Sequence, residues 1–194
     1  MTTIRKLEKR DDRSTFTCGD DDLNAFFRRQ AGQHQFKRRA SVTYLAMDDQ
    51  TFIAGFVTVS PGTLTRGDLG PAFKSYPPFP LPVLLLARLG VSTAMQGQGV
   101  GGRLLRHGLT LAVKLMDSAG CVGVVVDAKA NSLAFYEKYG FTPITMTPSG
   151  RHPRLFLPIT AIPGSCWKRA LMTCARRSRI LFKPGRCVRS VYLC

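Results

Sequence analysis

The chain has 194 residues, of which 44% are hydrophobic and 21% are charged, so it is long enough for one globular domain with a sizeable core. No stretch approaches the roughly 20 apolar residues that span a membrane. The segment MTTIRKLEKRDD has no apolar core of a secretory signal, so we expect a cytoplasmic protein that does not enter membranes. A net charge of +16 favours anionic partners such as nucleic acids or phosphorylated cofactors over cationic ones.

The charge is unevenly placed along the chain. No acidic residue follows Glu137, and residues 163–194 hold eight Lys or Arg residues and four of the six cysteines. This segment has no clear helical or strand periodicity. We therefore expect a folded domain over residues 1–162 and a basic, Cys-containing C-terminal tail over residues 163–194. The cysteines form no CxxC pair and the three histidines are scattered, so we predict free thiols and no metal site.

The first part of the chain predicts a strand, a helix and a hairpin. Residues 2–10 have the pattern of a strand. The acidic segment Cys18–Asn24 suits the start of a helix, which continues through the basic residues 26–40. Those charges form either a solvated face or a face that contacts phosphates. Residues 42–47 and 52–60 are β-branched and aromatic and predict a β-hairpin.

The second part predicts alternating strands and helices. We expect a loop over residues 61–82 with at most a short helix, a buried strand over 81–91, a helix over 101–119 and a second buried strand over 121–128. A helix over 132–140, closed by Gly140, and two strands over 141–146 and 154–159 follow. This order predicts an α/β fold with a mixed sheet covered by helices.

Four glycines lie between a predicted strand and a predicted helix, at Gly97, Gly99, Gly101 and Gly102. A strand, a glycine loop and a helix N-terminus together can cradle a phosphate, because the first N–H groups of the helix are unpaired. The segment contains no Walker A motif and fits the dinucleotide fingerprint GxGxxG only loosely.

The segment QGQGVG at residues 96–101 fits the pattern Q/R-x-x-G-x-G/A, and VVDAKANSLAFYEKYGF follows at residues 125–141. Over residues 3–162 the chain resembles the GNAT superfamily of acetyl-CoA-dependent N-acetyltransferases. The resemblance implies a mixed central sheet splayed between two parallel strands, 83–91 and 121–127, with the co-substrate acetyl-CoA in the wedge and its pyrophosphate on residues 96–102. The implied cofactor-binding residues are Leu89, Gly90, Val91, Gln96, Gly97, Gln98, Gly99, Val100, Gly101, Gly102, Arg103 and Asn131.

The same resemblance assigns the catalytic acid to Tyr136, which matches the tyrosine of the family pattern F-Y-x-x-x-G-F. A phenol is protonated at pH 7 and can donate a proton to the leaving thiolate. The other interpretation of Tyr136 is core packing beside Phe135. A backbone N–H near Leu89–Val91 would stabilise the carbonyl oxygen. No Glu or His is an obvious base, so the amine arrives deprotonated or water carries its proton away.

The segments FTCGDDDLNAFFRRQAGQ, VTYLAM, FIAGFVTVS and RLFLPI narrow the resemblance to the acetyltransferase toxins of type II toxin–antitoxin systems. It implies acetylation of the α-amine of aminoacyl-tRNA, which blocks translation. It also implies a ribbon-helix-helix antitoxin, contact with operator DNA only through the antitoxin complex, and a homodimer. The candidate tRNA contacts are Arg28, Arg29, Lys37, Arg38, Arg39, Arg88 and Arg103.

Two alternatives remain open at this point. The chain could acetylate a small-molecule amine or a protein amine, although it has few acidic residues to hold a polyamine. It could also be a non-catalytic binding module that keeps the fold. Retention of Tyr136 and the glycines argues against the second alternative.

Overall fold

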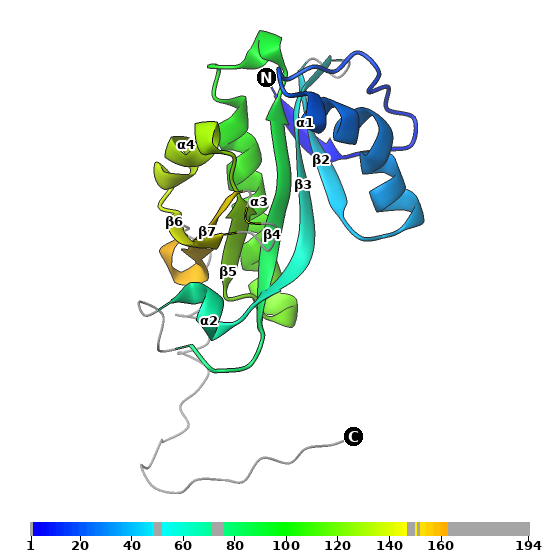
Figure 1. The fold of residues 1–194 in the computed structure, drawn as a ribbon. Helices are drawn as coiled ribbons and strands as arrows, with labels where there is room; N and C mark the ends of the chain where they lie inside the picture. Colours follow the sequence, from blue (N-terminus) through cyan, green and yellow to red (C-terminus); the bar gives the residue numbers. More distant parts are fainter. Residues whose placement is uncertain (1, 49–51, 71–75, 147–149, 151, 163–194) are drawn as a thin grey trace, which may run out of the picture. The chain divides into compact units, whose positions relative to one another are not determined.

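The computed structural model describes residues 2–162 except 49–51, 71–75, 147–149 and 151 (Figure 1). These residues belong to one unit that ends at Ile162. The predicted tail, 163–194, lies outside the described residues. No helix in the described part is long and apolar enough to cross a membrane.

A seven-stranded mixed sheet forms the centre of this unit, in the order β1-β2-β3-β4-β5-β7-β6. Among the described strands only β4 and β5 pair in parallel; the other neighbours are antiparallel. The predicted mixed sheet with one parallel pair is therefore confirmed. The strands are β1 (Thr3–Lys6), β2 (Val42–Asp48), β3 (Phe52–Leu64), β4 (Leu81–Val91), β5 (Gly123–Asp127), β6 (Thr142–Met146) and β7 (Pro153–Pro158).

Helices cover both faces of the sheet (Figure 1). The helix α1 (Asp21–Ala25) continues as two π-helical segments, η1 (Phe26–Gln30) and η2 (Gln33–Lys37). The Asp20 carboxylate caps α1 by accepting a hydrogen bond from the Leu23 amide at 3.0 Å. The remaining helices are α2 (Arg66–Leu69), α3 (Val100–Ala119) and α4 (Leu133–Glu137).

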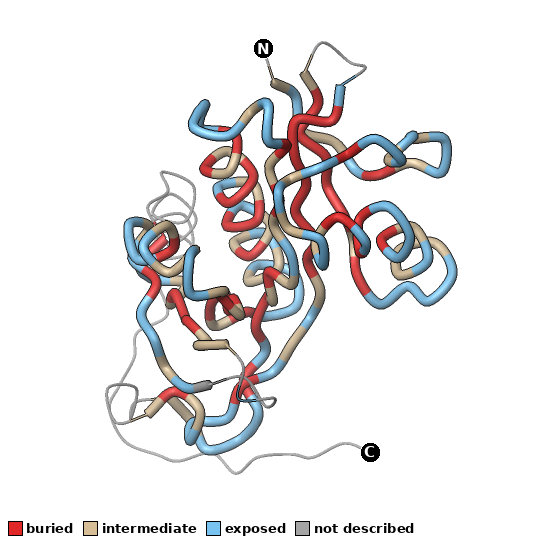
Figure 2. The backbone as a smooth tube through the Cα atoms, turned by 45° about the horizontal axis from the view of Figure 1, so that its top comes forward, coloured by how far each residue is buried: buried red, intermediate tan, exposed pale blue. Residues whose placement is uncertain are grey.

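The buried side chains show which helix covers which face. On one face, α3 packs Leu104, Leu105 and Leu109 against the sheet, together with Tyr136 of α4. On the other face, α1 and η1 cover the Phe56 end of β3, whereas α2 covers its Leu64 end. Figure 2 shows the buried residues concentrated in the central strands and on one side of α3. We call these two surfaces the α3 face and the α2 face.

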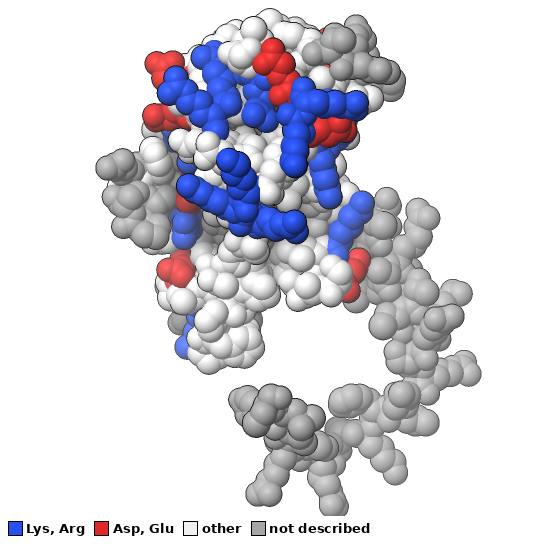
Figure 3. Space-filling model, turned by 90° about the vertical axis from the view of Figure 1, so that its right-hand side faces the viewer, with Lys and Arg blue, Asp and Glu red and all other residues white. Residues whose placement is uncertain are grey.

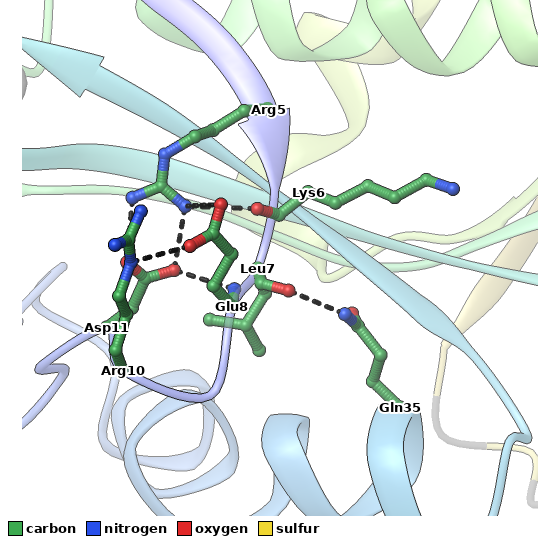
Figure 4. Close-up of polar contacts among 7 residues, drawn as sticks. All are labelled: Arg5, Lys6, Leu7, Glu8, Arg10, Asp11 and Gln35. Atoms are coloured by element: carbon green, nitrogen blue, oxygen red, sulfur yellow. Dashed lines mark hydrogen bonds and ion pairs between the residues drawn. The ribbon is translucent and has the colours of Figure 1, made fainter.

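The short edge strand β1 is fastened by side chains as well as by its backbone pairing with β2 (Figure 4). The Gln35 side chain donates to Leu7 O at 2.7 Å and accepts from the Thr43 amide at 2.8 Å, which links the end of β1 to the start of β2. The Arg5 guanidinium donates two hydrogen bonds to the Asp11 carboxylate, at 2.8 and 2.7 Å. These contacts close the turn after β1 beneath η2.

Several boundaries differ from the sequence prediction: the strand predicted over residues 2–10 spans only Thr3–Lys6, and the helix predicted over 132–140 spans only Leu133–Glu137. β3 runs to Leu64, although Pro61 and Gly62 had predicted a loop from residue 61. Beyond Val59 the partner strand β2 has ended, since Val42 is its first paired residue. A proline is tolerated there because that edge of β3 requires no ladder N–H. The basic helix also widens after Ala25, where the Ala31 amide donates to Phe26 O, five residues earlier.

Candidate active site

The parallel strands β4 and β5 pair at only three positions, Leu84–Leu86 with Val124–Val126. Beyond them β4 runs on to Val91, while β5 ends at Asp127. On its other side β4 carries a bulge, because Leu86 pairs with Val59 and Arg88 with Thr58, which leaves Ala87 as the extra residue. A bulge bends its strand, and β4 no longer pairs with β5 after Leu86. We call the space beyond the last pair, Leu86 and Val126, the β4–β5 opening.

The glycine loop, Gln96–Gly102, follows β4 and leads into α3. Gly97 and Gly99 have φ angles of 77° and 78°, in the left-handed region that favours glycine. A β-carbon at either position would have no heavy atom within 4 Å, and both residues are exposed. The first amides of α3 have no intrahelical acceptor. This open backbone with free N–H groups fits a phosphate or pyrophosphate.

The other two glycines of the loop are packed. A β-carbon at Gly101 would lie 3.5 Å from Val91 Cγ2, an ordinary contact. A β-carbon at Gly102 would collide with the Tyr139 hydroxyl. Gly102 is therefore required by the packing of Tyr139, in the turn after α4, against α3, a reason that the sequence did not reveal.

The polar side chains of the glycine loop hold the loop itself. Gln96 donates from Nε2 to Val91 O at 3.2 Å and to Cys18 O at 3.0 Å, and Gln98 donates to Ala94 O at 3.1 Å. Arg103 is different, because its Nε is buried and has no hydrogen-bond partner within the described part of the chain. A cationic group without a partner beside the free amides suits an anionic ligand.

The remaining predicted contacts lie around the β4–β5 opening. Gly90 is buried, and the Phe56 ring occupies the space that a side chain at this position would need. Leu89 and Val91 are half-buried and pack on the α3 face. Val100 is buried at the first turn of α3. Asn131 is exposed in the 3-10 turn Ala130–Ser132 before α4.

Tyr136 lies in the core of the α3 face with 6% of its surface exposed. Its ring packs edge-on against Phe135 and Phe141, with centroids 5.0 and 5.7 Å away. Burial raises the pKa of the Tyr136 phenol to about 12. The phenol therefore keeps its proton throughout the neutral range, as a general acid must.

Two groups of ion pairs near the β4–β5 opening were not singled out in the sequence. Arg154 of β7 holds the Asp127 carboxylate through two hydrogen bonds, at 2.7 and 2.8 Å. Lys129 pairs with Asp20 at 2.5 Å and with Asp22 at 3.5 Å. The signal that could have found Asp127 is a carboxylate at the end of the otherwise apolar strand VVVD.

The described cysteines and acidic residues do not form a metal centre. Within residues 2–162, apart from the stretches left undescribed, no three His, Cys, Asp or Glu side chains gather closely enough to hold a metal ion. Cys121 is buried and its thiol donates to Gly123 O, while Cys18 is half-buried. The other four cysteines lie outside the described residues.

Comparisons with known proteins agree with this geometry. Residues 39–143 match the family described as Acetyltransferase (GNAT) domain. A "tRNA-acetylating toxin" of Mycobacterium tuberculosis is 28% identical over 138 residues, which cover 71% of this chain and 82% of that protein. The "Probable toxin TacT" of Sinorhizobium fredii is 28% identical over 163 residues, covering 79% of this chain and 88% of that protein.

A solved structure shares the fold. It is a tyrosine-to-phenylalanine mutant of the toxin AtaT bound to the C-terminus of the antitoxin AtaR and acetyl-CoA, with a TM-score of 0.66 and 25% identity, covering 82% of this chain and 94% of that one. The family match spans more than half of the chain and includes the parallel strand β4, the glycine loop and Tyr136. The chain belongs to the GNAT acetyltransferases.

Proposed function

We propose that this acetyltransferase is a toxin that transfers the acetyl group of acetyl-CoA to the α-amine of aminoacyl-tRNA and so blocks translation. The proposal is supported by the curated relative named for tRNA acetylation, which this chain matches over 82% of its length. The observation that carries it is an exposed basic surface on the side of the molecule that bears α1, η1 and η2 (Figure 3).

The basic surface consists of the exposed residues Arg28, Arg29, Lys37, Arg38 and Arg39 on η1, η2 and the residues that follow. Part of the Arg28 guanidinium is already hydrogen-bonded within the protein, since its Nε donates to Phe16 O at 2.8 Å. Among the ion pairs of the described residues none involves Arg29, Lys37 or Arg38. These side chains are free to contact the phosphates of a polyanion.

Arg88 is also exposed, but it lies on β4, whereas the residues of the basic surface lie on η1, η2 and the residues that follow. Its guanidinium stacks over the Phe26 ring at 4.8 Å, and its Nη1 donates to Ala87 O at 2.9 Å. The first contact places Arg88 against η1, at the part of β4 that no longer pairs with β5. In the proposed function Arg88 meets the acceptor end of the tRNA, whereas the residues of η2 meet its backbone.

The chemistry is divided between two parts of the site. Acetyl-CoA supplies the activated acetyl group. The amides of the glycine loop and the Arg103 guanidinium hold the pyrophosphate, and a backbone N–H in Leu89–Val91 faces the thioester oxygen. Tyr136 gives its proton to the departing thiolate.

The family resemblance also supports a set of partners. We propose that a ribbon-helix-helix antitoxin neutralises the enzyme, that operator DNA is contacted only through that complex, and that the enzyme is a cytoplasmic homodimer. The related toxin AtaT, bound to the C-terminus of its antitoxin, supports the first of these proposals. We further propose that residues 1–162 form the acetyltransferase domain and residues 163–194 an appended basic tail.

The experiment that tests the function mixes the purified protein with labelled acetyl-CoA and a pool of charged tRNA. Label on the aminoacyl group that requires Tyr136 supports the proposal. Bound acetyl-CoA without labelled tRNA overturns it, and directs the search to a small-molecule or protein amine.

A matched pair of variants tests the basic surface. Lys37→Gln and Lys114→Gln each remove one exposed lysine charge from a helix, the first from η2 and the second from α3. Lys37→Gln should raise the KM for charged tRNA and reduce the salt dependence of binding by about one phosphate contact. Lys114→Gln should change neither, and equal effects of both variants would exclude this surface as the tRNA site.

A further inference from the structure

In the described part of the chain, the two faces of the sheet are covered to different extents near the β4–β5 opening. On the α3 face the sheet is covered by α3 and α4, whose side chains are buried around Tyr136. On the α2 face the cover is divided, with α1 and η1 over Phe56 and α2 over Leu64. Between these covers, Ser60 and Ala87 are half-buried and Arg88 is exposed. Among the described residues the α2 face is therefore the less covered side, from which an amine can approach.

Asp127 is the last residue of β5 and lies beside the β4–β5 opening. Val125 packs on the α2 face and Val126 on the α3 face, so the alternation of the strand puts Asp127 on the α2 face. Val126 is the last residue of β5 that pairs with β4. The carboxylate of Asp127 thus stands at the edge of the β4–β5 opening, on the side from which the amine approaches.

The position of the Asp127 carboxylate is fixed. Asp127 and Arg154 are directly opposite each other on β5 and β7, and the guanidinium holds both carboxylate oxygens. The hydrogen bonds that Arg154 donates to Asp127 raise the pKa of Arg154, and the charge of Asp68 on α2 raises it further. A carboxylate has about four lone-pair directions, so Asp127 can still accept hydrogen bonds from a ligand. About 28% of its side chain is exposed.

We propose that Asp127 is the acceptor-binding residue of this enzyme, which orients the amine and stabilises the charge that the nitrogen acquires during acetyl transfer. The inference rests on the proposed acetyl transfer to an amine. As the nitrogen forms its bond to the thioester carbon it becomes positively charged, and the carbon–sulfur bond then breaks. A fixed carboxylate beside that nitrogen lowers the energy of this state. The nitrogen then releases its extra proton to water and becomes the amide, while the departing thiolate takes a proton from Tyr136, which regains one from water.

The test compares two substitutions that each remove one carboxylate from the surroundings of Arg154. Asp127→Asn keeps the shape of the side chain but removes its charge, and we expect kcat to fall by roughly 10²-fold. Acetyl-CoA affinity should stay close to the wild-type value, and the melting temperature of both variants is measured because Asp127→Asn also loses the ion pair with Arg154. Asp68→Asn removes the charge on the far side of Arg154 and should change kcat by less than about three-fold.

Two acceptors separate this inference from the proposed function. Both variants and the wild type are assayed with charged tRNA and with an amino-acid methyl ester. If the wild type acetylates only the ester, the tRNA proposal fails and Asp127→Asn is judged on the ester. If it acetylates neither, both proposals fail. An Asp127→Asn enzyme with unchanged kcat, or equal losses in both variants, overturns the role of Asp127.

Discussion

The carboxylate of Asp20 caps α1 and also pairs with the ammonium group of Lys129, 2.5 Å away and 109 residues later in the chain. The segment just before Asp20 is attached to the residues that follow β4, since the Thr93 amide donates to Thr17 O and the Gln96 side chain donates to Cys18 O. Lys129 follows β5 by two residues. This ion pair therefore joins the two sides of the β4–β5 opening.

Replacing Asp20 by asparagine should separate the two roles of its carboxylate. Asparagine is an equally good cap, so Asp20→Asn should lose only the ion pair, worth up to about 1 kcal/mol at a partly exposed site. Asp20→Ala should lose the cap as well, roughly 0.5–2 kcal/mol more. Urea unfolding measures both, and equal losses in the two variants would show that the cap contributes nothing.

The same pair predicts a pH dependence. The hydrogen bond from Lys129 is the main cause that lowers the pKa of Asp20 below its ordinary value of 3.8. A lowered folded-state pKa gives a stabilisation that is present above the unfolded pKa and is lost as pH falls through the folded one. The difference in unfolding free energy between wild type and Asp20→Asn should therefore shrink as the solution is acidified below pH 4.

Gly99 and Gly101 should respond differently to alanine although they are two residues apart. Gly99 has a φ of 78°, so Gly99→Ala should cost about 1–2 kcal/mol and weaken acetyl-CoA binding by displacing the loop. Gly101 lies in α3 with room for a methyl group, so Gly101→Ala should retain or raise stability. Thermal unfolding with and without acetyl-CoA checks both variants. A stable Gly99→Ala protein with full affinity would contradict the proposed phosphate cradle.

Gly102 should be coupled to Tyr139. A methyl group at position 102 would meet the Tyr139 hydroxyl, so Gly102→Ala should destabilise the protein by roughly 1–3 kcal/mol. Removing that hydroxyl in a Gly102→Ala, Tyr139→Phe double variant should restore most of the loss. A double-mutant cycle measures the coupling, and additive effects would show that α3 and the turn after α4 do not meet at this point.

Tyr136→Phe should leave acetyl-CoA affinity nearly unchanged while turnover falls by roughly 10²–10⁴-fold, the usual contribution of a general acid. Because the pKa of Tyr136 is about 12, turnover should show no loss from phenol ionisation up to pH 9. Tyr139→Phe removes a hydroxyl from the same short segment and is the matched control. Unchanged turnover in Tyr136→Phe would leave Tyr136 with a packing role only.

Much of the fold follows from local patterns in the sequence. The apolar segment Leu81–Val91 predicted β4 to the residue, and the glycines and the apolar spacing after them predicted α3 to within one residue of its start at Val100. These elements are long and rich in apolar residues, so the local sequence is enough to predict them. The short helix around Tyr136 was also predicted, with Gly140 in the left-handed conformation behind it.

The sequence could not reveal features that depend on pairing between distant strands. Whether Pro61 continues a strand depends on where β2 ends, and whether Asp127 matters depends on which strand stops pairing first. The bulge at Ala87 likewise exists only in relation to β3. The ends of strand pairing and the bulge are set by the register between strands, and a short stretch of sequence does not contain that information.

The central sheet is joined across β4 and β5 by only three residue pairs, whereas α3 packs against strands on both sides of that junction. Side-chain packing tolerates small slides that a hydrogen-bonded ladder does not. Substitutions of buried α3 residues such as Leu104 or Leu105 can therefore change the spacing of β4 and β5, and so the width of the β4–β5 opening. Related enzymes can thus come to accept acceptors of a different size through substitutions in the core, while the reacting groups stay the same.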